Sequence, residues 1–182
     1  MTDQSVEARV TRSRDYIVNL QKSLSGERRL IMGLEHGTMS AAAALIAYLP
    51  ARALGLQQSF WGAITATAVV QTEFGATRTS ARDQFTGAAI GGLIGVAIVS
   101  LIGQEVISYT AAVIVSITAC WMLNVTSAAR LAGVTTTIIM LVPHADSAQS
   151  MMVARVTEVA WGVFVAVGVV WIANKLRLVN KS

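Results

Sequence analysis

Charge, cysteine and histidine are all scarce in this chain of 182 residues. Charged side chains make up 13% of it and hydrophobic ones 54%, whereas a soluble domain carries charge at about a quarter of its positions. The single cysteine, Cys120, excludes an intrachain disulfide and a multi-cysteine metal site. Phosphate-binding, serine-hydrolase and zinc-protease motifs are absent. The sequence therefore predicts no enzyme, no metal centre and no cofactor.

The charge-poor sequence is organised in apolar runs separated by short polar breaks. These runs lack the alternation of a barrel strand and approach the roughly 20 residues that a membrane-spanning helix needs. They cover residues 33–49, 59–74, 85–102, 106–123, 128–142 and 153–173. We therefore predict an all-α, polytopic membrane protein with six transmembrane helices.

Basic residues are distributed unevenly over the two sides of this topology. The side that holds both termini and the second and fourth loops has twelve of the 14 lysines and arginines. The other side has only Arg52 and Arg155. By the positive-inside rule, both termini lie in the cytoplasm, and a bacterial inner membrane is the expected location. The net charge of +4 does not indicate nucleic acid, because the basic residues are not interleaved with stacking aromatics.

The first 30 residues are polar but have one apolar face. Five aliphatic residues recur there at helical spacing: Val6, Val10, Ile17, Leu20 and Leu24. We divide the chain into a cytoplasmic amphipathic leader (1–30), a transmembrane domain (31–178) and a cytoplasmic tail (179–182). Three roles remain open for the leader: binding anionic lipid of the inner leaflet, packing against a helix of a partner, or forming a solvated tail.

Small residues in the third and sixth runs predict close helix packing. Gly87, Gly91 and Gly95 are four apart, so they line one side of a helix and allow another backbone to approach. Gly162 begins a looser stripe of the same kind in the last run. The threonines at 135–137 are expected to hydrogen-bond between helices or to line a cavity.

The third and sixth runs also begin alike. Asp83 stands four residues before Gly87, and Glu158 stands four residues before Gly162. An arginine precedes each acidic residue, and Arg155 is expected to pair with Glu158. A three-helix unit repeated in tandem inserts its second copy upside down, so we predict an inverted repeat of three plus three helices.

Two arginines and a tryptophan are candidates for substrate binding. Arg78 and Arg82 are one helical turn apart, and guanidinium groups match the geometry of carboxylates. Trp61, next to an aromatic neighbour, is a candidate for stacking on an aromatic substrate. The alternatives are that the arginines only anchor the topology, and that Trp61 and the other three tryptophans form the interfacial belt.

Four ionisable residues are candidates for proton coupling, because such groups near a membrane are costly. Glu73 is predicted in the last turn of the second run, at the cytoplasmic mouth, and Asp83 opens the third. Glu35 and His36 open the first run, and histidine titrates near neutral pH. The alternative for each is an interfacial ion pair, such as Glu73 with Arg78.

Two stretches resemble a known family. The stretch "LGLQQSFWGAITATAVVQTEFGATRTSARDQFTGAAIGGLIG" and the later "ARVTEVAWGVFVAVGVV" are similar to the fusaric acid resistance protein-like family, which includes the aromatic acid exporters. The resemblance implies a six-helix inner-membrane transport unit. Larger members of that family carry two such units and a soluble domain, so this single unit suggests a homo-oligomer.

The function that fits these features is secondary export of aromatic carboxylates or related organic anions. The expected partners are membrane lipid, the anion, and further copies of the chain or another membrane protein, but no nucleic acid. Few polar residues fall at the predicted midplane, which favours the alternative of a non-transporting accessory or assembly subunit. A passive channel is a third possibility.

Overall fold

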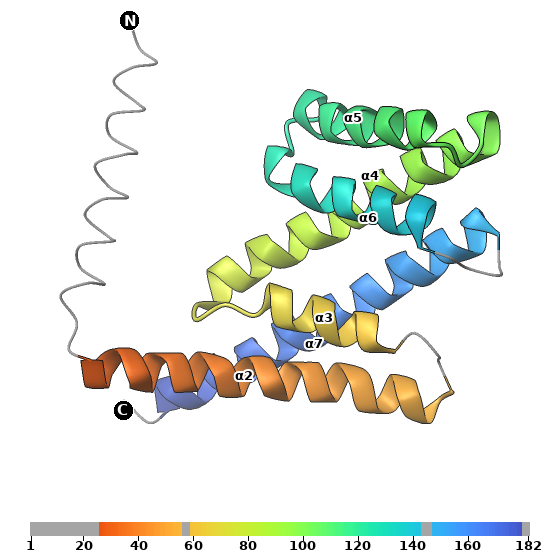
Figure 1. The fold of residues 1–182 in the computed structure, drawn as a ribbon. Coiled ribbons are helices and arrows are strands. Elements are labelled where there is room, and N and C mark those ends of the chain that lie inside the picture. Colours follow the sequence, from red (N-terminus) through yellow and green to blue (C-terminus); the bar gives the residue numbers. More distant parts are fainter. Residues whose placement is uncertain (1–25, 56–58, 143–146, 180–182) are drawn as a thin grey trace, which may run out of the picture. The chain divides into compact units, whose positions relative to one another are not determined.

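Helices account for nearly all of the chain that the computed structural model describes, residues 26–55, 59–142 and 147–179 (Figure 1). The elements are α2 (Gly26–Ala53), α3 (Phe60–Val69), α4 (Phe74–Ile102), α5 (Val106–Met122), the short 3-10 helix η1 (Thr126–Ala128), α6 (Ala129–Leu141) and α7 (Ala148–Val179). Within these described ranges there is no strand, so the all-α prediction is confirmed. The apolar face proposed for the leader lies outside the described residues.

The chain divides into two compact units, with the boundary after Gly37. The described part of the first unit is the beginning of α2, and the second unit holds Thr38 to Ser182. The division into leader, transmembrane domain and tail stays a prediction.

Three of the helices are long and apolar enough to cross a membrane: α2, α4 and α7, with 28, 29 and 32 residues. The other apolar helices are shorter. The most marked case is α3, whose 10 residues rise only about 15 Å, half of the roughly 30 Å hydrocarbon core. Transmembrane helices are thus supported, and the count of six spans stays a prediction.

The boundary between α3 and α4 differs from the predicted one. The second run was expected to be helical to Phe74, but α3 ends at Val69 and α4 already begins at Phe74. The buried hydroxyl of Thr77 accounts for the break. It accepts a hydrogen bond from the Gln71 N–H (3.0 Å) and donates one to the Glu73 carbonyl oxygen (3.0 Å). These bonds satisfy backbone groups that an unbroken helix would have paired internally.

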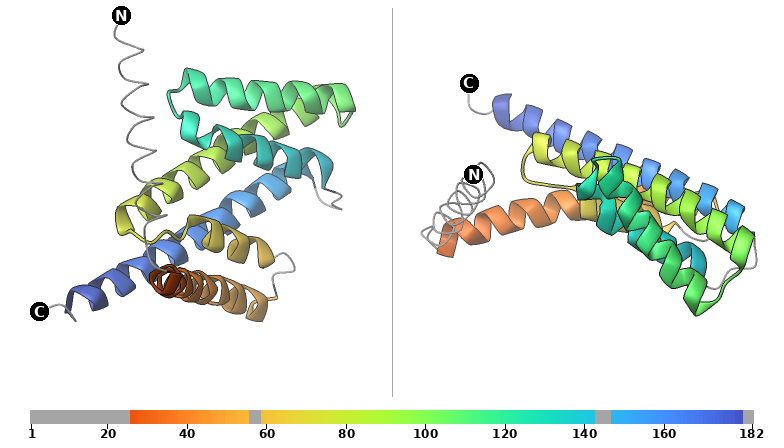
Figure 2. Two further views of the ribbon diagram at one scale, coloured as in Figure 1. Left: turned by 60° about the vertical axis from the view of Figure 1, so that its left-hand side comes forward. Right: turned by 90° about the horizontal axis from the view of Figure 1, so that it is seen from above.

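The second unit is built around α4 and α7, which lie side by side and antiparallel (Figure 2). Near one end Gly92 lies against Met152, and toward the other Phe74 and Trp171 line the same groove. The remaining helices cover this pair, with α3 packed on α7 and both α5 and α6 packed on α4. Of the shorter helices, α7 therefore carries one and α4 carries two.

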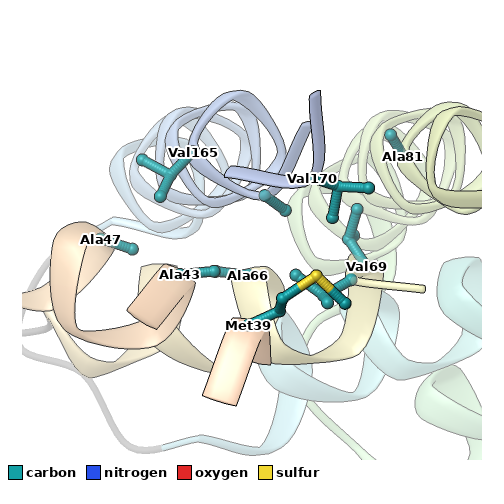
Figure 3. Close-up of a cluster of buried hydrophobic side chains, with 10 residues drawn as sticks. Met39, Ala43, Ala47, Ala66, Val69, Ala81, Val165 and Val170 are labelled. Atoms are coloured by element: carbon teal, nitrogen blue, oxygen red, sulfur yellow. The ribbon is translucent and has the colours of Figure 1, made fainter. Parts of the chain in front are cut away.

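Small residues form the core between α2, α3, α4 and α7. Figure 3 shows this cluster, whose labelled members are Met39, Ala43, Ala47, Ala66, Val69, Ala81, Val165 and Val170. Alanine and valine keep the helix backbones close, which favours association where lipid supplies no hydrophobic drive. Large apolar side chains lie instead on the outside, for example Ile107 and Met122 of α5. Such a surface is typical of a protein embedded in lipid.

The glycines of α4 lie against α6. A Cβ atom at Gly91 would overlap the carbonyl oxygen of Ala132, and one at Gly87 would come within 2.6 Å of the Leu131 Cβ. Thr136 of α6 hydrogen-bonds to both α4 and α5. Its hydroxyl lies 3.0 Å from the Gly91 carbonyl oxygen of α4 and 2.7 Å from the Ser116 hydroxyl of α5. The expected hydrogen bonding of the threonines between helices is therefore present.

Candidate functional site

A groove of about 500 Å³ runs between the beginning of α4 and the second half of α7. Four aromatic rings line it, Phe74 and Phe85 from α4 and Phe164 and Trp171 from α7. Small and aliphatic residues of α7 complete its wall. The volume falls in the range of about 300–1,000 Å³ that is typical of small-molecule sites, and aromatic lining is characteristic of them.

Positive charge is present on the same helix faces as the aromatic rings. Phe74, Arg78, Arg82 and Phe85 follow one another on α4 at spacings of four, four and three residues, which places them along one side of the helix. On α7, the Lys175 ammonium group lies 5.3 Å from the centre of the Trp171 ring. The groove is therefore lined by apolar side chains alone, and three cations lie on the same two helices outside its lining.

The two predicted anion-binding arginines differ in their surroundings. Arg82 is largely exposed, with 74% of its side chain accessible, and its Nε lies 4.0 Å from a carboxylate oxygen of Asp83. Arg78 is also exposed, and it makes no ion pair with any described residue. Both guanidinium groups are thus accessible to a ligand from outside the protein.

The four predicted proton-coupling residues lie at different places. Glu73 was predicted to lie in the last turn of the second run. It is instead the exposed residue immediately before α4. Asp83 lies inside α4, and only 14% of its side chain is accessible. Glu35 and His36 belong to the first turns of α2, in the first unit. The His36 Nδ1 atom is buried and has no hydrogen-bond partner among the described residues.

Trp61 is separate from the aromatic groove. It lies on α3, and its ring stacks beneath the guanidinium group of Arg155, at 4.2 Å from the ring centre. The Phe60 ring lies beside it at 5.0 Å. One face of the indole is therefore covered by an arginine of α7, and stacking of Trp61 on a substrate stays a prediction.

Arg155 and Glu158 form the expected ion pair, at 3.2 Å. The pair is far more buried than an interfacial pair would be, with 5% of the arginine and 16% of the glutamate side chain accessible. Close packing of α7 on α3 and on α2 explains this burial. A Cβ at Gly162 would come within 2.5 Å of the Gly62 carbonyl oxygen, and Trp161 donates its indole N–H to the Ala47 carbonyl oxygen at 2.9 Å.

The aromatic groove itself was not predicted from the sequence. Its residues are far apart in the chain, and Trp171 was assigned to the interfacial belt. One signal was present: Phe74 and Phe85 are three helical turns apart, and Phe164 and Trp171 are two turns apart, so each pair shares a helix face. That the two faces meet follows only from the antiparallel packing of α4 and α7.

Residues 32–169 match the family described as fusaric acid resistance protein-like. The chain belongs to this family. No curated protein and no solved structure matches the chain. The resemblance identified from the sequence is therefore confirmed, and the matched segment includes α3 to α6 and most of α7. Membership in this membrane transport family, together with three long apolar helices, indicates a transport-type function in a membrane.

Proposed function

We propose that this chain is a secondary transporter that exports aromatic carboxylates or related organic anions. The observation that carries the proposal is the aromatic groove between α4 and α7, with Arg78 and Arg82 on the same face of α4 and Lys175 near its other wall. Aromatic walls favour a flat ring, and a guanidinium fork binds a carboxylate with two parallel hydrogen bonds. A small aromatic acid satisfies both features at once.

The proposal includes an orientation in a bacterial inner membrane. The excess of basic residues on the side that holds both termini supports a cytoplasmic location for the beginning of α4 and the end of α7. In this orientation the groove and its cations face the compartment from which an exporter collects its substrate. The arginines then attract the anion, and the rings hold it.

The inverted repeat remains part of the proposal, and the packing supports it. Each half has a short helix, α3 or α6, followed by a long one, α4 or α7. The short helix of each half packs on the long helix of the other half. The glycine contacts correspond as well, because Gly87 meets α6 near Ala128 and Gly162 meets α3 near Gly62. A pseudo-twofold axis of this kind suits alternating access.

A homo-oligomer is proposed for the assembly. The exposed apolar residues of α5 offer a surface for lipid or for a second copy. Cross-linking in native membranes, followed by mass measurement, tests this part of the proposal.

Equilibrium binding of fusaric acid to the detergent-purified chain tests the groove. Replacement of Arg82 by Gln removes a charged hydrogen bond worth about 1.5–3 kcal/mol, so affinity is expected to fall about tenfold to a hundredfold. Trp171→Leu is expected to weaken binding as well. The matched control is Trp121→Leu on α5, a tryptophan that is 66% exposed. Equal affinity for all three variants and the parent would exclude the groove as the binding site, and no binding to the folded parent would favour the accessory subunit.

A further inference from the structure

Arg155 has far more hydrogen-bonding capacity than its surroundings use. A guanidinium group has five N–H donors. In the described structure, one of them reaches a Glu158 carboxylate oxygen at 3.2 Å, whereas the buried Nε has no partner. The face of the group is held over the Trp61 ring at 4.2 Å. Stacking fixes the plane of the guanidinium group, and the buried Nε–H on its edge is a donor without an acceptor among the described residues.

This pair is costly if its only role is structural. Moving two charges out of water costs free energy, and their mutual attraction offsets this cost only when further hydrogen bonds satisfy both groups. Arg155 lacks such further hydrogen bonds. Ionisable groups buried in membrane proteins are therefore functional candidates by default. Neither residue of the pair lines the aromatic groove, and the pair lies where α3 packs on α7.

No other ionic group competes for the pair in the described structure. The α3 helix has no ionisable side chain, so its contribution is Trp61. Among the other helices packed nearby, α4 has Asp83 with its neighbouring arginines, α6 has Arg130, and α2 has Arg52 beside Tyr48. None of these side chains is bonded to Arg155 or Glu158. The charge state of Glu158 therefore determines whether Arg155 has an anionic partner.

We propose that Arg155 is a second anion site for the same aromatic carboxylates and that the Glu158 side chain blocks it as a tethered competitor. The inference rests on the proposed function. When a proton from water binds Glu158, the carboxylate becomes neutral and the ion pair is lost. A substrate carboxylate then takes its place on the edge of the guanidinium group. Loss of the proton re-forms the pair and releases the anion, and no covalent bond other than that to the proton changes.

Trp61 acts as a positioning residue in this account. It holds the guanidinium group flat while the anionic partner is exchanged, because a cation over an indole face is attracted by the ring quadrupole. Acid conditions therefore open the second site, and alkaline conditions close it. The aromatic groove, whose cations are arginine and lysine, remains available under both conditions.

Calorimetric binding of benzoate to the purified full chain tests the proposal. Benzoate stays ionised between about pH 6 and about pH 8, since carboxyl groups titrate near pH 4. The parent is expected to bind a second benzoate per chain as the pH falls. E158Q is expected to bind the second benzoate at every pH, and E105Q, which changes a glutamate before α5, is expected to behave as the parent.

A double variant, R155Q/E158Q, separates the proposed role from a purely structural one. It keeps the shape of the pair but has no unpaired charge, so it remains testable even if E158Q does not fold. The expected result is a folded protein that has lost the second benzoate at all pH values. A second benzoate that persists in this variant, or a pH dependence that survives in E158Q and disappears in D83N or E73Q, would overturn the proposal.

The failure of the proposed function gives a different result. If the folded parent binds no benzoate and no other aromatic carboxylate at either pH, the groove and the second site are both excluded. If the parent binds one benzoate in the groove and never a second, only the Arg155 site is excluded.

Discussion

Replacing Gly91 with alanine adds one methyl group where, of all the glycines, a Cβ atom would meet its neighbour most closely. The new Cβ would overlap the carbonyl oxygen of Ala132, which belongs to the backbone of α6 and cannot rotate away. The backbones of α4 and α6 must therefore move apart. That movement also stretches the hydrogen bond from the Thr136 hydroxyl to the Gly91 carbonyl oxygen, now 3.0 Å.

The expected cost follows from these two effects. Overpacking of a close contact costs about 1–3 kcal/mol, and a lost hydrogen bond costs about 1 kcal/mol. Alanine returns up to about 1 kcal/mol through its higher helix propensity. The net loss in the free energy of unfolding is therefore about 1–3 kcal/mol.

Gly95→Ala is the matched control for this prediction. It makes the same chemical change one turn further along the same face of α4, where the nearest atom to the new Cβ is the Ile139 Cγ2 at 3.4 Å. Both variants are compared with the parent by thermal unfolding in detergent and by the yield of folded protein. The reasoning predicts that Gly91→Ala unfolds at a lower temperature than Gly95→Ala. Equal stability of the two variants would show that α4 and α6 are not in contact at Gly91.

Three further changes test other contacts. Thr136→Val removes the bonds to Ser116 and to the α4 backbone, so the free energy of unfolding in denaturant should fall by about 1–3 kcal/mol; an unchanged value would remove this network from the account. Arg82→Gln is expected to slow transport while the elution volume of the purified protein stays constant, because the side chain is exposed, and parental transport kinetics would exclude Arg82 from the site. Arg155→Gln leaves the Glu158 carboxylate buried without a cation, which should cost about 3–5 kcal/mol of stability. Adding Glu158→Gln to this variant should restore most of the lost stability. If the double variant is no more stable than Arg155→Gln, the two residues are not coupled.

Local sequence features predicted the helical class, the family and several contacts. The spacing of three residues between Arg155 and Glu158 is sufficient to predict their pairing on one helix face. The bounds of α5 and α6 also follow closely from the ends of two apolar runs. In these cases the interacting groups belong to one helix or one continuous run, so sequence spacing alone determines them.

Contacts between helices account for what the sequence did not predict. Helix α4 begins at Phe74, before the start of the third run predicted at 85–102. Its beginning depends on hydrogen bonds between the Thr77 hydroxyl and the backbone, which the hydropathy of the segment does not reveal. The stacking of Trp61 on Arg155 joins residues of different helices. The aromatic groove likewise exists only because two faces meet. Tertiary packing of this kind is not encoded in the periodicity of a single segment.

Uptake of aromatic carboxylates, fusaric acid among them, into proteoliposomes that contain the purified chain tests the central claim most directly. It is measured with and without an imposed pH gradient, and protein-free vesicles correct for permeation of the neutral acids. The account predicts protein-dependent flux that responds to the gradient and is reduced in Arg82→Gln. Absence of flux for every compound tested, from protein shown to be folded, would contradict the account and favour an accessory subunit.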